Sequence, residues 1–410
     1  MIIYIWNMAL LHVSIVSITK KEKKMKSRMI RILSVAGRYL VCFLLILGGC
    51  TGLGVFLTGC TLHLADVPGI NPRGNEDDAV RRTDTAMGTV FSMNIDLGPE
   101  SEAISLKILD LVRELESGEL SWRLNTSQVY ALNHGKHIEE DGELVEILKW
   151  CGQLSRDSAG AFDVTVGNLT SLWDIDRLAS GEENAFVPGT SGSESILPDQ
   201  NAILDALAHS GYDKMEWTGN RVLLREGIRL DLGAVGKGIA LDRIYELLEE
   251  HKAIEKQEAA GAQALPAGGA VISAGGSIMT YGSKPGGTPW TVAIVDPKNP
   301  SGFIGYLSLE GTRFVSTSGD YERYIEVDGR RYCHIIDPTT GYPVDNGISG
   351  VTVVADSGLK SDGLSTALFV LGPGKGLELA GRYGVEALFV DSEGKITMTE
   401  GMEKLFTPGT

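Results

Sequence analysis

Apolar residues recur with helical spacing in several stretches of this chain. Between residues 101 and 117 they stand at positions 104, 108, 111, 112 and 115, which places them on one face of a helix. The same spacing predicts further helices over residues 143–154, 201–209, 239–251 and 374–383, and another that begins near Asp362.

Short alternating or continuous apolar runs predict strands between these helices. They are expected over residues 85–96, 228–231, 271–274, 290–295, 351–355, 387–390 and 396–398. Asp328-Gly329 separates two further runs and is a strong hairpin signal. Paired strands interspersed with helices predict an α+β fold with mixed or antiparallel sheets and packed helices.

The N-terminal region has the pattern of a secretory signal. A basic segment at residues 20–31 precedes an uncharged apolar run at 39–59. Small residues before Cys50 and before Cys60 suggest a bacterial lipoprotein signal, and Cys60 has the more typical context. The alternative is an uncleaved anchor, because 21 uncharged residues can span a bilayer. Either interpretation places the body outside the cytoplasm, anchored to the cell membrane.

The chain divides by composition into a leader, a tether and one body. Residues 1–60 form the leader, of which 1–24 resemble an over-extended start. Residues 61–83 are polar with proline and glycine and predict a tether, and 84–407 form the folded domain. Flexible insertions are expected near 178–199 and 253–268.

Charge is unevenly distributed along the 410 residues. Residues 1–38 hold five lysines, three arginines and one glutamate, which gives a charge of +7. Residues 39–60 hold no charged residue and the whole chain has a formal charge of −16, so the residues after 60 carry −23. So acidic a body argues against nucleic-acid binding, which depends on phosphate neutralisation. An anionic nucleotide would need a metal ion and local lysine or arginine.

The five cysteines form no zinc pattern. No CxxC or Cys/His spacing is present, which speaks against zinc. A disulfide between Cys151 and Cys333 is compatible with the sequence but is not required by it.

Asp362 and Thr366 are the first candidates for chemistry. Residues four apart lie on one helix face, so a carboxylate and a hydroxyl point in the same direction. Such oxygen ligands suit Mg²⁺. The alternative is that Asp362 only caps the helix.

His334 is the second candidate, as a general base. It precedes Ile335-Ile336, so it could instead be a packed histidine at a strand end, with Asp337 beginning an ordinary turn. A base and a hard-cation site within about thirty residues together favour cleavage or transfer of a phosphate ester or pyrophosphate.

A glycine-rich loop at residues 233–238 lies between an expected strand and an expected helix. That arrangement often cradles phosphate. The spacing fits neither the P-loop nor the dinucleotide fingerprint, so a tight turn is the alternative.

Six short motifs in order carry a family resemblance. They are Met87-Gly88-Thr89 and residues 160–167, 231–238, 317–321, 334–341 and 361–372. Together they resemble the ApbE family of FAD:protein FMN transferases, over roughly residues 85–406.

The resemblance implies an ApbE-like, T-fold-related domain and a specific reaction. The family moves FMN from FAD, its substrate, to a threonine hydroxyl of an acceptor flavoprotein and releases AMP, assisted by Mg²⁺. It implies that Asp362, Thr366 and the carbonyl of Ala234 hold the metal, with Ser365 as a weaker candidate. His334 would be the base, and Asp337 would orient it or the incoming hydroxyl.

The resemblance also implies an FAD pocket. Lys237 would place a cation near the phosphates, and an aromatic at Trp122 could stack on a flat ring. The matching positions are Met87, Trp122, Ala161, Phe162, Asp163, Asp231, Lys237 and Ile335. The chain departs from the family pattern at residues 120–129, and it has Gly363 where alanine is usual.

Other functions remain open at this point. An FAD pyrophosphatase giving FMN and AMP would use the same groups, with water in place of the threonine hydroxyl. A non-catalytic flavin-binding lipoprotein would hold FAD without turnover, and a transport lipoprotein would share only the leader.

Overall fold

The computed structural model describes residues 79–139, 142–179, 197–218, 221–258, 268–284 and 286–409. The chain divides into two units, Met1–Thr58 and Gly59–Thr410, and all described residues belong to the second. The expected leader, with Cys50 and Cys60, lies outside the described residues, as do most of the two expected insertions.

An eight-stranded antiparallel sheet forms the centre of the described unit. Its strand order is β1-β2-β6-β7-β10-β13-β14-β15. The strands are β1 (Val80–Ala86), β2 (Thr89–Asp96), β6 (Gly269–Ala274), β7 (Ser277–Gly282), β10 (Arg313–Gly319), β13 (Ile348–Ala355), β14 (Glu386–Asp391) and β15 (Ile396–Met398).

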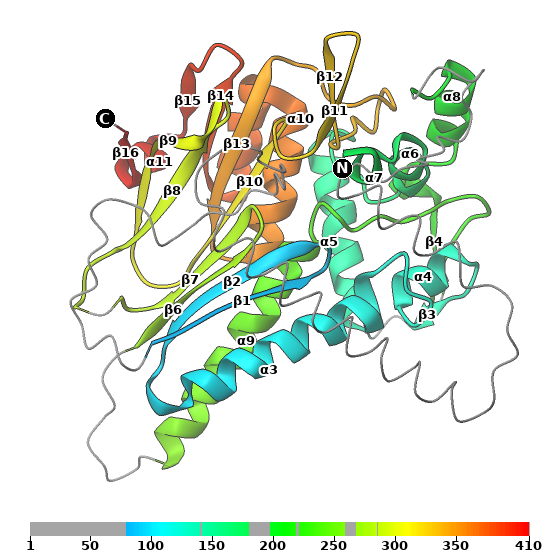
Figure 1. The fold of residues 1–410 in the computed structure, drawn as a ribbon. Helices are drawn as coiled ribbons and strands as arrows, with labels where there is room; N and C mark the ends of the chain where they lie inside the picture. Colours follow the sequence, from blue (N-terminus) through cyan, green and yellow to red (C-terminus); the bar gives the residue numbers. More distant parts are fainter. Residues whose placement is uncertain are drawn as a thin grey trace, which may run out of the picture. The chain divides into compact units, whose positions relative to one another are not determined.

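Three long helices cover one face of this sheet (Figure 1). They are α3 (Ser101–Leu115), α9 (Gly236–Glu258) and α10 (Gly358–Tyr383). The main hydrophobic core lies between these helices and the sheet and includes Phe91, Phe314, Leu364 and Phe389. Burial of this face holds α9 and α10 against each other, and the site is built where they meet.

A smaller sheet packs on the opposite face. Its order is β16-β9-β8, with β8 at Trp290–Asp296, β9 at Asn299–Leu309 and β16 at Phe406–Pro408, next to α11 (Glu400–Leu405). Strand alternation explains the two cores, because Phe314 faces the helices while Val315 faces this second sheet.

The remaining elements build a region beside the main sheet. The helices are η2 (Glu116–Leu120), α4 (Gln128–Asn133), α5 (Glu143–Asp157), α6 (Gly167–Trp173), α7 (Ile175–Ala179) and α8 (Gln200–Ala208). The strands are β3 (Ile138–Glu139), β4 (Met215–Thr218), β5 (Arg221–Leu224), β11 (Tyr324–Val327) and β12 (Arg330–Cys333), and the short turns are η1 (Gly98–Glu100) and η3 (Tyr212–Lys214). A third core around Leu169, Trp173 and Ile203 joins α6 and α8 to the β11–β12 hairpin.

The α+β fold is confirmed, but one strand prediction is right only in part and one is wrong. The strand expected over 85–96 is present as β2 over residues 89–96, but Met87 (φ 52°) and Gly88 (φ 66°) adopt the left-handed conformation and form the turn of a hairpin, so residues 85 and 86 belong to β1. Its first strand begins at Val80, inside the segment expected as tether. Residues 228–231 form no strand and contribute a single bridge between Val166 and Arg229.

The helix predictions are mostly confirmed. The expected helices at 101–117, 143–154 and 201–209 correspond to α3, α5 and α8, and the hairpin at Asp328-Gly329 is present as β11–β12. The helix expected at 374–383 is the second half of α10, which kinks at Gly372.

Two further observations concern the cysteines and the helices. Cys151 and Cys333 are buried free thiols, and burial raises the pKa of Cys333 to about 11. Within the described ranges, no helix is both long and apolar enough to span a membrane.

Candidate functional site

Asp362 lies in the second turn of α10, not at its cap. The N-cap is Ser357, whose hydroxyl oxygen accepts a hydrogen bond from the amide of Lys360 at 3.2 Å. The capping alternative for Asp362 is therefore wrong, and the carboxylate is free for another role. Asp362 is only 3% exposed.

Two hydrogen-bond donors and one lysine surround the Asp362 carboxylate. The amide of Gly238 donates to Oδ2 at 2.9 Å, and the hydroxyl of Ser277 donates to Oδ1 at 2.9 Å. The Nζ of Lys237 lies 3.4 Å from Oδ1. A buried charge needs such partners, and here they come from α9 and β7.

Two glycines let α9 and α10 approach closely enough for these contacts. A side chain on Gly238 would clash with the carbonyl of Gly358 and stand 2.8 Å from Cβ of Asp362. From one turn further along α9, Asp242 accepts hydrogen bonds from the amides of Gly358 (2.6 Å) and Leu359 (2.8 Å) at the start of α10. Burial raises the pKa of Asp242 to about 6.

Thr366 and Ser365 differ in their availability. The hydroxyl of Ser365 is committed to Ser318 and to the Asp362 carbonyl, each at 2.8 Å. The Oγ1 of Thr366 makes only long contacts of 3.4 Å with Ser318 and with the Asp362 carbonyl. Thr366 is therefore the better placed of the two to give a lone pair to a ligand.

The Ala234 carbonyl also fits a hard cation. In a regular helix it would accept from the amide of Gly238, but that amide donates to Asp362 instead. Among the described residues no hydrogen bond to the Ala234 carbonyl is found. A carboxylate, a hydroxyl and a carbonyl are the oxygen donors that Mg²⁺ accepts. Among the described residues no group of three His, Cys, Asp or Glu side chains is placed to hold a metal ion.

His334 follows directly after β12 and is neutral near pH 7. Its Nδ1 lies 3.2 Å from the carbonyl oxygen of Arg323. Because a carbonyl can only accept, Nδ1 carries the proton and Nε2 holds the lone pair. Burial and the Arg323 charge lower the pKa of His334 to about 4, against an opposing effect of Asp176.

Asp176 from α7 completes this group. Its Oδ2 forms an ion pair of 2.9 Å with Arg323. Burial acts to raise the pKa of Asp176, but the charge of Arg323 and its hydrogen bond act against burial, and the pKa is lowered. Asp176 thereby fixes the arginine whose carbonyl orients the histidine ring.

Asp337 stabilises its own turn. Its Oδ1 accepts from the amide (2.8 Å) and the hydroxyl (2.7 Å) of Thr339. Within the described ranges no hydrogen bond joins Asp337 to His334, so the geometry favours the turn over an orienting role.

The two aspartates expected in the flavin pocket hold backbone in place. Asp163 accepts from the amide and hydroxyl of Thr165 and from the amide of Tyr212 at 2.6–2.9 Å. Burial raises its pKa. Asp231 accepts from the hydroxyl of Thr170 and the amide of Gly233, both at 2.8 Å.

The expected apolar pocket residues are largely buried. Ala161, Phe162 and Ile335 are covered by the protein, and Phe162 belongs to the main core. Met87 is half-buried, and its Cε would lie 3.3 Å from a side chain on Gly236 at the start of α9. Trp122 packs partly against the core, and the guanidinium of Arg123 stacks 3.9 Å from its ring centre.

The separate motifs meet in space. A side chain on Gly160 would stand 3.7 Å from Thr339, which joins residues 160–167 to 334–341. The indole of Trp173 donates to the carbonyl of Gly341 at 2.8 Å. The positive charge of Lys237 also contributes to the lowered pKa of His334, which links the histidine to the Asp362 cluster.

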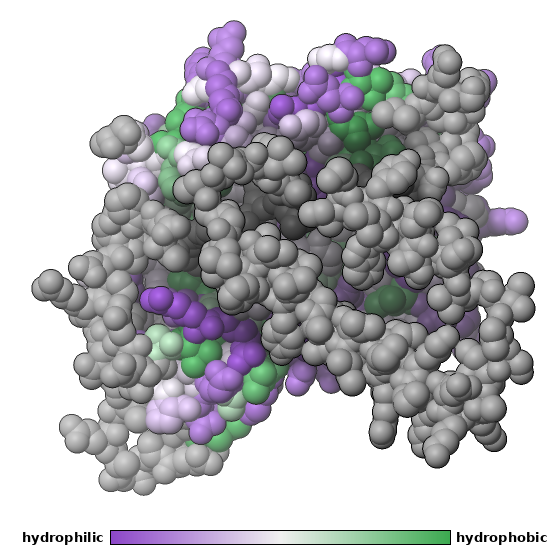
Figure 2. All heavy atoms as spheres, in the orientation of Figure 1, coloured by the Kyte–Doolittle hydropathy of each residue, from purple (hydrophilic) through white to green (hydrophobic). Residues whose placement is uncertain are grey.

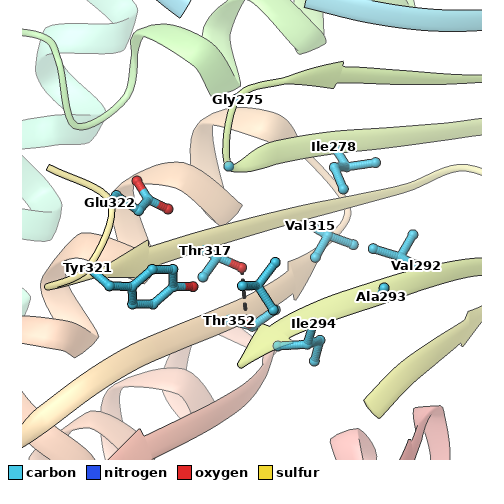
Figure 3. Close-up of a pocket in the computed structure, with 12 residues that line it drawn as sticks. Gly275, Ile278, Val292, Ala293, Ile294, Val315, Thr317, Tyr321, Glu322 and Thr352 are labelled. Atoms are coloured by element: carbon cyan, nitrogen blue, oxygen red, sulfur yellow. Dashed lines mark hydrogen bonds between the residues drawn. The ribbon is translucent and has the colours of Figure 1, made fainter. Parts of the chain in front are cut away.

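Glu322 is a half-buried carboxylate that directly follows the motif at residues 317–321. It lines a cavity of about 30 Å³ between the two sheets, beside Tyr321, Gly275 and the hydrogen-bonded pair Thr317–Thr352 (Figure 3). Burial, with the Asp362 charge, raises the pKa of Glu322 to about 7 against the effects of Lys237 and Arg323. The cavity has room for about two water molecules and is far too small for a dinucleotide.

Three more residues were not foreseen. Ser277 and Asp176 carry no motif, and they join the site through pairing partners more than 80 residues away. Arg323 acts through its carbonyl, which any residue provides. Only Glu322 had a signal, as a carboxylate directly after residues 317–321.

The hairpin next to His334 is hydrophilic at its tip. Asp328, Gly329, Arg330 and Arg331 are exposed, and purple residues cover this part of the visible surface in Figure 2. Arg330 pairs with Asp345 at 2.9 Å, so part of this charge is already neutralised.

Known proteins resemble this chain in both sequence and fold. A sequence model of the ApbE family matches residues 87–389, and the chain belongs to that family. A FAD:protein FMN transferase of Klebsiella pneumoniae is 32% identical over 317 residues, covering 75% of this chain and 88% of the relative.

Two solved structures resemble the described unit. The ApbE protein of Thermotoga maritima gives a TM-score of 0.66 at 30% identity, covering 80% of this chain and 99% of that protein. The flavinyl transferase ApbE of Pseudomonas stutzeri, in its apo form, gives 0.62 at 31% identity, covering 81% and 98%.

Proposed function

We propose that this chain is a Mg²⁺-dependent FAD:protein FMN transferase. It moves FMN from FAD to a threonine hydroxyl of an acceptor flavoprotein and releases AMP. The observation that carries the proposal is the Asp362 carboxylate, buried and held by Gly238, Ser277 and Lys237 where α9, α10 and β7 meet. Membership of the ApbE family and the names of its relatives support the flavin substrate.

Asp362, Thr366 and the Ala234 carbonyl would hold the metal. When bound there, Mg²⁺ supplies positive charge that offsets the negative charge developing on the pyrophosphate oxygens. Lys237 would bind the same phosphates as a second cation, which matters in a body with a formal charge of −23.

His334 takes the proton in the proposed reaction. The acceptor hydroxyl oxygen attacks the phosphorus of the FMN half, a new P–O bond forms, and the bond to the AMP oxygen breaks. The lone pair on Nε2 accepts the hydroxyl proton while Nδ1–H keeps its hydrogen bond to the Arg323 carbonyl. The negative pyrophosphate raises the pKa of the imidazole above its value of about 4 in the free protein.

The flavin would lie beside the motif residues that the resemblance assigns to the FAD pocket. Ala161 and Phe162 have buried side chains, so they would contact the flavin through their own backbone atoms, directly after the turn at Ala159-Gly160. Met87, Trp122, Asp163, Asp231 and Ile335 would shape the same pocket. Localisation outside the cytoplasm, through a lipid on Cys60 or Cys50, is proposed from the leader sequence alone.

One assay separates the proposed activity from its alternatives. The purified protein is incubated with FAD, Mg²⁺ and a candidate acceptor domain containing a threonine, and the acceptor is examined by mass spectrometry. A covalent FMN adduct on threonine is expected. Free FMN with an unmodified acceptor would indicate a pyrophosphatase, and intact FAD bound without turnover would indicate a storage protein.

A further inference from the structure

Ser277 makes a contact that sets it apart from the buried serines beside it on β10. It is the first residue of β7, directly after the turn at Gly275-Gly276, and it is 0% exposed. Its hydroxyl lies 2.9 Å from Oδ1 of Asp362. Because an ionised carboxylate only accepts, Ser277 is the donor.

The neighbouring hydroxyl pairs have a purely structural geometry. Ser316 and Ser361 bond to each other at 2.9 Å, and Ser318 and Ser365 at 2.8 Å. Both pairs join β10 to α10 as neutral hydroxyls. Ser277 joins α10 in the same manner but meets a charged group, and a charge-assisted hydrogen bond is roughly twice as strong.

The strand register places Ser277 next to one of these structural serines. Ser277 and Ser316 are direct partners in the β7–β10 ladder, so their side chains stand on the same sheet face, toward α10. Ser316 is also 0% exposed. The two serines therefore lie opposite each other on paired strands, are equally buried and bond to the same helix, and they differ in whether the partner residue is Asp362.

Counting lone pairs shows what Ser277 does for Asp362. A carboxylate offers about four lone-pair directions. Gly238 occupies one on Oδ2, Ser277 one on Oδ1, and Lys237 lies near Oδ1. Of these directions, one on Oδ2 has no donor among the described residues, which leaves a defined position for a cation.

We propose that Ser277 is a positioning residue that fixes Asp362 in the orientation that binds Mg²⁺. This inference rests on the proposed function, because it assigns the metal to Asp362. Hydrogen-bond partners of a metal ligand typically change metal affinity by about 10- to 100-fold when removed. We expect an effect at the lower end, because Gly238 still holds the other oxygen.

The test compares Ser277→Ala with Ser316→Ala. Mg²⁺ alone is titrated into each purified full chain in a calorimeter, without FAD, and unfolding free energies are measured in parallel. Each variant loses one buried hydrogen bond, so both should lose a similar, small amount of stability. The Mg²⁺ dissociation constant should rise about 10-fold in Ser277→Ala and stay within about twofold in Ser316→Ala.

A second variant keeps the test decisive if Ser277→Ala does not fold. Ser277→Cys fills the same space with a weaker donor, and an intermediate loss of Mg²⁺ affinity is expected. Unchanged Mg²⁺ affinity in the folded Ser277 variants would overturn the inference, as would an equal loss in Ser316→Ala. If the wild-type chain itself bound no Mg²⁺, the proposed metal site would fail and this inference with it.

Discussion

At the scale of single residues, the site depends on the hydrogen-bond partners of Asp362 and His334. Asp362 has two hydrogen-bond donors and a nearby lysine, and His334 has one backbone carbonyl that selects its tautomer. The Asp362–Thr366 pair was visible in the sequence because both members lie on one helix. Ser277 was not visible, because its partner is 85 residues away and the contact exists only after the sheet has formed.

Removing the imidazole should separate chemistry from binding. We expect His334→Ala to lower the rate of FMN transfer by about 10²- to 10⁴-fold, since it removes the proton acceptor. FAD affinity should change little. Single-turnover transfer and FAD titration measure the two quantities, and transfer at the wild-type rate would exclude His334 as the base.

Glu322 should make stability depend on pH. Its pKa is raised from the usual 4.5 to about 7, so between these values the folded state keeps a proton that the unfolded chain has lost. The contribution of Glu322 to stability therefore falls as pH rises through this window and is lowest above pH 7. Glu322→Gln should be more stable than wild type at pH 8, by on the order of 2 kcal/mol, and nearly equal at pH 5.

Urea unfolding at both pH values, with a chelator present, measures this difference. Glu326→Gln on β11, just after the turn that holds Glu322, is the control, because Glu326 is exposed. An equal effect of the two substitutions, or a pH-independent effect of Glu322→Gln, would contradict the assignment.

At the scale of elements, the close approach of α9 and α10 creates the site. Gly238 and Gly358 let the two helices touch, and Gly363 leaves room for Trp150, whose ring atoms would lie 2.8 Å from a Cβ there. Gly238, the last glycine of the 233–238 loop, is thus needed for the packing of the two helices, whether or not the loop contacts phosphate.

A methyl group at this crossing should disrupt both stability and metal binding. Gly238→Ala would clash with the Gly358 carbonyl and Asp362, so we expect a loss of about 1–3 kcal/mol or more and weaker Mg²⁺ binding. Gly381→Ala, on an open face of α10, should gain up to about 1 kcal/mol. Thermal unfolding of both variants decides this, and a neutral Gly238→Ala would argue against the tight crossing.

The sequence predicted helices better than strands. Helical periodicity identified α3, α5 and α8 because each buries one face. Strands β7 and β10 were missed because they are buried on both faces or carry inward serines, so they show no alternation. The turn at Met87-Gly88 was missed because methionine gives no signal for a positive φ.

At the scale of the whole molecule, the charge distribution separates a basic leader from an acidic body. Only the body lies among the described residues, so the lipid anchor remains a proposal from the sequence. The motifs at residues 87–372 gave the family correctly, because six weak patterns in the right order are together specific.

The leader makes a separate prediction about lipid attachment. In cells given a labelled fatty acid, the wild-type chain should carry the label, Cys60→Ser should lose it and Cys50→Ser should keep it. The reverse pattern would assign the lipid to Cys50. Absence of label from the wild-type chain and from both variants would favour an uncleaved anchor.

The central claim is that transfer of FMN depends on the cation held by Asp362. The most direct measurement quantifies AMP and FMN-modified acceptor after incubation with FAD and Mg²⁺, for wild type and for Asp362→Asn. Wild type should give AMP and modified acceptor in equal amounts, and both should disappear in Asp362→Asn or with a chelator. If Asp362→Asn modified the acceptor as fully as wild type does, and did so in the presence of chelator, the claim would be contradicted.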